Sequence, residues 1–279
     1  MPASEIMHHN FHLTTSDGLQ LAANEWRPEG TPLMSVMLVH GQGEHMGRYH
    51  LFGEVLAENG VRCIGVDLRG HGISQGKRGH VKKWSDYFSD LDAVAELLPA
   101  QYSIIGHSMG GLIALGYGLR NQQRISSIAV TGPLLGVSIE PAAWKEAMSG
   151  LLSVIMPSLP FDTEMPLTEL ISDQEAVQRY VKDALRVPNV TPRWYVEMKK
   201  EIAAVFSLAE TAEVPLFAHY GEKETIVDPA MVRLIHERWA LPEKNLTVWP
   251  GCCHELHQEP DAERIITQIF EEISKSIQK

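Results

Sequence analysis

Ser108 lies at the centre of a Gly-x-Ser-x-Gly pattern, Gly106-His107-Ser108-Met109-Gly110. The apolar segment "YSIIGHS" precedes it and the glycine-rich segment "GGLIALGYG" follows, which predicts a sharp turn between a buried strand and a helix. Such a turn requires small residues two positions before and two positions after the serine, and both are glycine. The turn would place the hydroxyl above a helix amino terminus, whose amides favour developing negative charge. The pattern therefore predicts a nucleophilic serine.

A nucleophilic serine needs a base that takes its proton. The segment "TVWPGCCHELHQEP" follows the last short apolar segment and offers His254 and His257. We predict that His254 is the base, because it comes directly at the turn after that strand. No metal site is expected, since the spacing His-Glu-Leu-His is one residue shorter than the zinc-binding helix motif and prolines flank it.

The base in turn needs a carboxylate that orients its ring, and the chain order nucleophile, acid, base places this acid between Ser108 and His254. The stretch "LFAHYGEKETIVDP" is typical of a strand end, a turn and the start of a helix, and it holds Glu224 and Asp228. Asp228 precedes Pro229 and is also typical of a helix cap. Both carboxylates are candidates on this evidence.

A fourth element is the loop "LVHGQGEHMGRY", which follows the first long buried strand. A loop at this position can supply a backbone amide to an oxyanion hole. Gly41 and Gly43 would let the backbone approach a reacting carbonyl. We assign the two donors to the amides of Gln42 and Met109.

The elements that must position these residues follow from the apolar periodicity. A hairpin turning at Asp17-Gly18 is followed by apolar segments that end in glycine or precede a turn, namely "LMSVMLVHG", "VRCIGVDLRG", "YSIIGHS", "ISSIAVTG", "VPLFAHYG" and "NLTVWPG". Helical patterns separate them at about 49–59 and 84–97, and a final helix with one apolar stripe follows Pro260. This alternation predicts an α/β fold with a mostly parallel central sheet flanked by helices.

One region interrupts the alternation. From 134 to 208 the sequence is helical in pattern, rich in Met, Leu and Pro, and contains no convincing strand. We expect a helical cap inserted after the sixth strand, over the edge of the sheet where ligands bind. The predicted organisation is a core formed by residues 1–133 and 209–279, with the cap at 134–208.

Composition narrows the function classes. The 279-residue chain has a formal net charge of -11, which argues against a nucleic-acid partner because no basic surface would offset phosphate repulsion. The amino terminus lacks the pattern of a secretory signal, and three cysteines are too few for a disulfide framework. We expect a cytoplasmic protein that is peripheral at membranes, with a transient contact between its apolar cap and a membrane or micelle. Nothing in the sequence indicates an oligomeric state.

The motifs together resemble the α/β-hydrolase family of monoglyceride lipases and bacterial lysophospholipase-like enzymes. The resemblance rests on "HGQGEHMGRY", "VDLRGHGISQGKRGHV", "GHSMGG" and "GCCHELHQEP", and it extends to the cap segments "VIMPSLPFDT" and "VQRYVKD". It implies the α/β-hydrolase fold, no metal and no organic cofactor. It also implies a small lipid ester as substrate.

The resemblance further implies individual roles. Members of this family usually carry aspartate three residues after the glycine that ends the acid strand, and Glu224 occupies that place in this chain, so we choose Glu224 over Asp228. Glutamate can serve, because the acid holds the imidazole tautomer and stabilises the imidazolium. The first histidine of the family's His-x-x-His is the base, in agreement with His254.

The resemblance also implies substrate contacts. Glu44, Arg48 and His257 match a polar pocket for the glycerol alcohol, and Tyr180 matches a cap tyrosine near the product exit. A salt bridge between Arg48 and Glu44 that fixes the loop is a second interpretation, and both can hold at once.

The expected reaction is hydrolysis of monoacylglycerol to fatty acid and glycerol through an acyl-enzyme. A lysophospholipase, a general carboxylesterase or a thioesterase would use the same residues. A cap-bearing aminopeptidase and a non-catalytic scaffold are the remaining alternatives.

Overall fold

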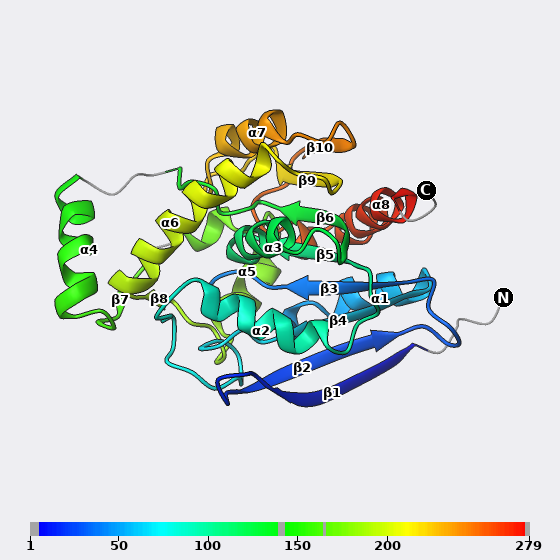
Figure 1. The fold of residues 1–279 in the computed structure, drawn as a ribbon, viewed down its shortest axis with the longest axis horizontal. Coiled ribbons are helices and arrows are strands. Elements are labelled where there is room, and N and C mark those ends of the chain that lie inside the picture. The colour runs from blue at the N-terminus through cyan, green and yellow to red at the C-terminus, as the bar shows by residue number, and fades with distance from the viewer. Residues whose placement is uncertain (1–5, 139–142, 164–165, 277–279) are drawn as a thin grey trace.

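The computed structural model describes residues 6–138, 143–163 and 166–276 (Figure 1). Within these ranges the central sheet has eight strands in the order β1-β2-β4-β3-β5-β6-β9-β10. Strand β2 pairs antiparallel with both β1 and β4. All pairs among β3, β4, β5, β6, β9 and β10 are parallel. Their bounds are β1 (Met7–Thr14), β2 (Gln20–Arg27), β3 (Met34–Val39), β4 (Val61–Val66), β5 (Tyr102–His107), β6 (Ile125–Thr131), β9 (Leu216–Gly221) and β10 (Lys244–Trp249).

The apolar segments predicted as strands are the strands of this sheet. Every residue of β3, β5 and β9 is buried, as expected of parallel strands covered on both faces. The expectation of a mostly parallel α/β sheet with an initial hairpin is confirmed.

Helices cover both faces of the sheet. On one face lie α1 (His50–Glu58) and α8 (Ala262–Lys275), which share a core with Trp26 and Leu38. The other face is covered by α2 (Ser85–Ala95), α3 (Met109–Arg120) and α7 (Pro229–Arg238). Helix α8 follows Pro260 as predicted, begins at Ala262, and buries its apolar stripe at Ile265, Ile266, Ile269 and Ile273, while Ile277 lies outside the described residues.

Between β6 and β9 the chain forms the elements predicted as a cap: α4 (Ala143–Ile155), α5 (Gln174–Val181) and α6 (Pro192–Ala209). Helix α6 begins as its sequence predicts, with Thr191 accepting from the Trp194 amide and Pro192 in the first turn. Figure 1 shows α4 projecting beyond α6 at one end of the molecule, whereas α6 lies beside α3.

The prediction of a cap without strands is wrong in one detail. Strand β7 (Phe161–Asp162) pairs antiparallel with β8 (Asn189–Val190). Two-residue strands carry no period-2 pattern, so hydropathy alone cannot reveal them. Within the described ranges, no helix has both the length and the apolar character that crossing a bilayer requires.

Candidate active site

Ser108 occupies a strained turn between β5 and α3. Its φ of 51° makes it the one residue other than glycine with positive φ in the described part of the chain. A side chain at Gly106 would collide with the Gly110 carbonyl, and one at Gly110 would collide with the Val39 carbonyl. The two glycines are therefore required by the turn, and the strain is typical of a functional site.

His254 and Glu224 form a buried ion pair. The distance from His254 Nδ1 to Glu224 Oε2 is 2.6 Å, and the residues are 2% and 7% exposed. The other carboxylate oxygen, Oε1, accepts hydrogen bonds from the amides of Ile226 (2.8 Å) and Val227 (3.2 Å). The carboxylate is thus fixed at both oxygens, with one of them facing the imidazole.

The electrostatics of the pair favour its charged form. Burial raises the pKa of Glu224, but His254 and the two amides outweigh it, so this pKa lies below its ordinary value. Burial likewise lowers the pKa of His254, and the Glu224 carboxylate outweighs it, so the pKa of His254 lies above its ordinary value. The Glu224 carboxylate therefore stabilises the imidazolium form of His254.

Asp228 has a different role. Its side chain accepts from the Ala230 amide at 2.8 Å and caps the amino terminus of α7. The structure therefore places Glu224, and not Asp228, against the His254 ring.

The serine turn and the ion pair meet at the carboxyl ends of β5 and β6. The ring of His107 lies 4.8 Å from the ring of His254, and the Ser108 amide donates to the β6 carbonyl just before Gly132 at 2.9 Å. A Cβ at Gly132 would lie 2.9 Å from His254 Nδ1 and 3.1 Å from Glu224 Oε2. Glycine at this position gives the imidazole room beside the serine turn.

The loop after β3 lies on the other side of the serine. A Cβ at Gly41 would be 3.2 Å from the Ser108 Cβ. Gly43 has φ of 83° and accepts from the Val187 amide in the cap at 3.0 Å. Within the described residues, the amides of Gln42 and Met109 donate to no protein acceptor, as an oxyanion hole requires.

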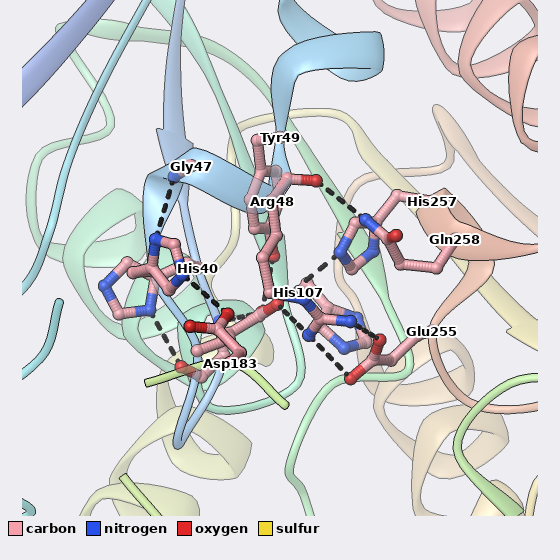
Figure 2. Close-up of polar contacts among 12 residues, drawn as sticks. His40, Gly47, Arg48, Tyr49, His107, Asp183, Glu255, His257 and Gln258 are labelled. Carbon is pink, nitrogen blue, oxygen red and sulfur yellow. Dashed lines mark hydrogen bonds and ion pairs between the residues drawn. The ribbon is translucent and has the colours of Figure 1, made fainter. Parts of the chain in front are cut away.

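Glu44, Arg48 and Glu255 form a charge cluster that is almost fully buried. Figure 2 shows Arg48 and Glu255 at its centre. Arg48 Nη1 lies 3.1 Å from Glu44 Oε2 and 3.0 Å from Glu255 Oε1, and Nη2 lies 2.5 Å from Glu255 Oε2. Glu44 Oε1 also accepts from the Gly41 amide (2.5 Å) and the Tyr49 hydroxyl (2.7 Å). The salt bridge that fixes the loop is present.

The other two predicted substrate contacts belong to the same cluster. The Nε2 atom of His257 lies 3.5 Å from Glu44 Oε2, and neither ring nitrogen forms a hydrogen bond within the described residues. His257 stacks on Tyr49 with ring centroids 4.4 Å apart. Tyr180 lies under the Arg48 guanidinium, with 4.4 Å from the guanidinium carbon to the ring centroid. The three residues expected to hold the alcohol and the tyrosine expected near the product exit therefore lie together.

Sequence reasoning missed two carboxylates of this region. Glu255 lies between His254 and His257 in the sequence, and this position could have indicated that its carboxylate belongs to the site. Glu259 is 4% exposed and accepts from the Cys253 amide (2.8 Å), the Ser172 amide (3.1 Å) and the Ser172 hydroxyl. No local pattern marks Glu259, because its partner in the cap lies 87 positions away.

Comparisons with known proteins identify the family and the fold of the chain. A family profile described as serine aminopeptidase, S33 matches residues 30–261. The phospholipase YtpA of Bacillus subtilis is 29% identical over 86% of this chain and 94% of its own, and a monoacylglycerol lipase of Mycolicibacterium smegmatis is 26% identical over 90% and 92%. An uncharacterized abhydrolase domain-containing protein of Dictyostelium discoideum is 30% identical over 96% of this chain, which spans 29% of that protein's length. The crystal structure of Paleococcus ferrophilus monoacylglycerol lipase superimposes with a TM-score of 0.83 at 26% identity, covering 98% of this chain and 99% of that one.

Proposed function

The chain belongs to the serine aminopeptidase S33 family of α/β-hydrolases, and we propose that it is a serine esterase that cleaves monoacylglycerols to fatty acid and glycerol. Its relatives place it with the monoglyceride lipase-like members of that family. The observation that carries the proposal is the buried 2.6 Å pair of His254 and Glu224 next to the strained turn of Ser108.

The first half of the reaction forms an acyl-enzyme. His254 Nε2 takes the proton from the Ser108 hydroxyl as the oxygen attacks the ester carbonyl, and Glu224 stabilises the resulting imidazolium. The amides of Gln42 and Met109 stabilise the oxyanion of the tetrahedral intermediate. The carbon–oxygen bond to the alcohol then breaks, and His254 gives the proton to the departing glycerol oxygen.

The second half releases the fatty acid. His254 takes a proton from water as the water oxygen attacks the acyl carbonyl, and the proton returns to the Ser108 oxygen when the acid leaves. The same oxyanion donors serve both steps. No residue other than the serine becomes covalently modified.

The alcohol side of the site supports a polyol leaving group. Glu44 offers carboxylate oxygens that accept hydrogen bonds from hydroxyls, and neither ring nitrogen of His257 has a hydrogen-bond partner in the described structure. Because both groups are buried, they bind an alcohol away from competing water. Glycerol supplies hydroxyls that suit both.

Two other substrates are favoured by specific findings. The similarity to YtpA, which is named a phospholipase, favours a lysophospholipid. The family description favours an aminopeptidase, which needs free acids to bind a substrate amine. Glu44 and Glu255 are both paired with Arg48, so a substrate amine would compete with that guanidinium for the same carboxylates.

The proposal is tested by measuring glycerol and fatty acid release from monoacylglycerols, with lysophosphatidylcholine and an aminoacyl amide in parallel. We expect turnover of monoacylglycerol that falls by roughly 10⁴-fold or more in Ser108→Ala. Turnover of the amide or of lysophosphatidylcholine without turnover of monoacylglycerol would replace the proposed substrate.

A further inference from the structure

Arg48 is the guanidinium of the proposed alcohol site, and three of its five N–H donors are already bonded to carboxylates. Nη1 bonds to both Glu44 and Glu255, and Nη2 bonds to Glu255. The Tyr180 ring covers one face of the group, and the Arg48 side chain is 9% exposed. An anion that bound the Nη1 and Nη2 edge of Arg48 would therefore compete with Glu255 for a buried, bidentate pair.

The charge balance of the cluster also disfavours an anion. Glu44 and Glu255 both pair with Arg48, so these three side chains together carry one net negative charge. Burial raises the pKa of Glu44, but His257, His107 and Arg48 outweigh it and hold that pKa well below its ordinary value, so the carboxylate stays ionised. A phosphate beside these carboxylates meets like charge that the protein interior screens poorly. Alcohol hydroxyls, in contrast, donate to the same carboxylate oxygens.

We propose that Glu255 is a specificity-determining residue, which makes the alcohol site accept an uncharged polyol and reject a leaving group that bears a phosphate. This inference rests on the ester hydrolysis proposed above and names the leaving group of that same site. Glu255 acts by occupying Arg48, the cation that a phosphate would otherwise use.

A second cation, Arg186, lies near the Arg48 cluster, so the experiment must also examine it. The Arg186 guanidinium carbon is 5.3 Å from the Tyr180 ring centroid, and its buried Nη1 has no hydrogen-bond partner in the described structure. Asp183, close to it in the sequence, is paired with His45 at 2.8 Å. If a phosphate were accepted, Arg186 is the group that would receive it.

The experiment compares kcat/KM for three esters of one acyl chain: 1-acylglycerol, 1-acylglycerol 3-phosphate and a p-nitrophenyl ester. For the wild type we expect a preference of about 100-fold for the acylglycerol over its phosphate. In Glu255→Gln the ratio of kcat/KM for the acylglycerol to that for its phosphate should fall at least about tenfold, and the p-nitrophenyl ester reports any general effect of the substitution on the triad. Glu263→Gln, which makes the same charge change at an exposed position of α8, should leave all three values unchanged.

Each contrary result has one meaning. Wild-type values for the acylglycerol and its phosphate within threefold of each other overturn the inference and leave the proposed function intact. An equal loss on all three esters in Glu255→Gln overturns it as well, because the residue would then only position the site. If the wild type cleaves 1-acylglycerol 3-phosphate strongly and Arg186→Gln loses this activity, Arg186 forms an anion subsite and the inference is overturned. If the wild type cleaves none of the three, the proposed function itself fails. The wild-type comparison needs no variant, so it stands even where a substitution disturbs folding.

Discussion

At the scale of single residues, Glu224 shows how a longer acid can hold a catalytic ring. An extra methylene relative to aspartate adds a rotatable bond, which by itself would loosen the carboxylate. Here the carboxylate oxygen that does not contact His254 accepts hydrogen bonds from the amides of Ile226 and Val227. These bonds restrict the carboxylate to one orientation. The loop geometry thus compensates for the added length.

The first prediction concerns the identity of this acid. Glu224→Gln keeps the size of the side chain but removes the charge that stabilises the imidazolium, so we expect kcat on monoacylglycerol to fall by roughly 10³- to 10⁴-fold. Asp228→Asn is the matched control, and because asparagine also caps helices it should change kcat less than about twofold. The reverse ranking of the two variants would move the assignment to Asp228.

The second prediction concerns pH. The base must be neutral to take the serine proton, and the net effect of Glu224 raises the pKa of His254 above its ordinary value. We therefore expect kcat/KM to fall as pH decreases through that raised pKa. In Glu224→Gln the raising partner is lost, so the midpoint of this acid limb should move to lower pH. A midpoint that is unchanged in the variant contradicts the ion pair as the cause.

At the scale of elements, the loop that carries His254 is joined to the cap. Glu259 accepts from the Cys253 amide directly before the histidine and from Ser172 in the cap. The Glu255 amide donates to the Leu170 carbonyl at 2.8 Å. The position of the base therefore depends on the position of residues 170–172.

The third prediction tests Glu259 as a positioning residue. In Glu259→Gln an amide NH₂ group replaces one carboxylate oxygen, so one of the three hydrogen bonds to this side chain is lost and the loop that carries His254 is held less firmly. We therefore expect kcat to fall about tenfold on both a monoacylglycerol and a small soluble ester, with KM little changed. Glu263→Gln serves as the control for charge. A lower melting temperature with unchanged kcat would mean that Glu259 acts on stability alone.

These elements also show what the sequence could predict. The parallel strands were recognisable because strands buried on both faces are continuous apolar runs. The serine turn was recognisable because only glycine fits the two positions flanking it. The pairing of Arg48 with Glu255 was not, since it joins residues 207 positions apart through tertiary packing. The β7–β8 pair escaped because two residues carry no periodicity.

At the scale of the whole molecule, the cap presents an apolar surface on α4. Met148, Leu151, Val154 and Ile155 are 47%, 62%, 71% and 62% exposed. We propose that this surface contacts the lipid aggregate in which an acylglycerol substrate resides. The chain's formal net charge of -11 makes apolar contact, rather than attraction to anionic headgroups, the basis of such binding.

The fourth prediction follows from that surface. Leu151→Ser combined with Val154→Ser removes apolar area from α4, so we expect weaker flotation with zwitterionic vesicles and lower activity on aggregated monoacylglycerol. Hydrolysis of a monomeric soluble ester should stay the same. Val248→Ser, at a 43% exposed position of β10, is the control for surface apolarity and should bind vesicles as the wild type does. Equal flotation of all three proteins would contradict the proposed contact.

The most direct test of the Ser108–His254–Glu224 assignment is covalent labelling with a fluorophosphonate, with the modified residue located by mass spectrometry. The account predicts a single adduct on Ser108, none in Ser108→Ala, and much slower labelling in Glu224→Gln, because activation of the serine depends on the His254–Glu224 pair. An unlabelled wild-type protein, or an adduct on another residue, would contradict it.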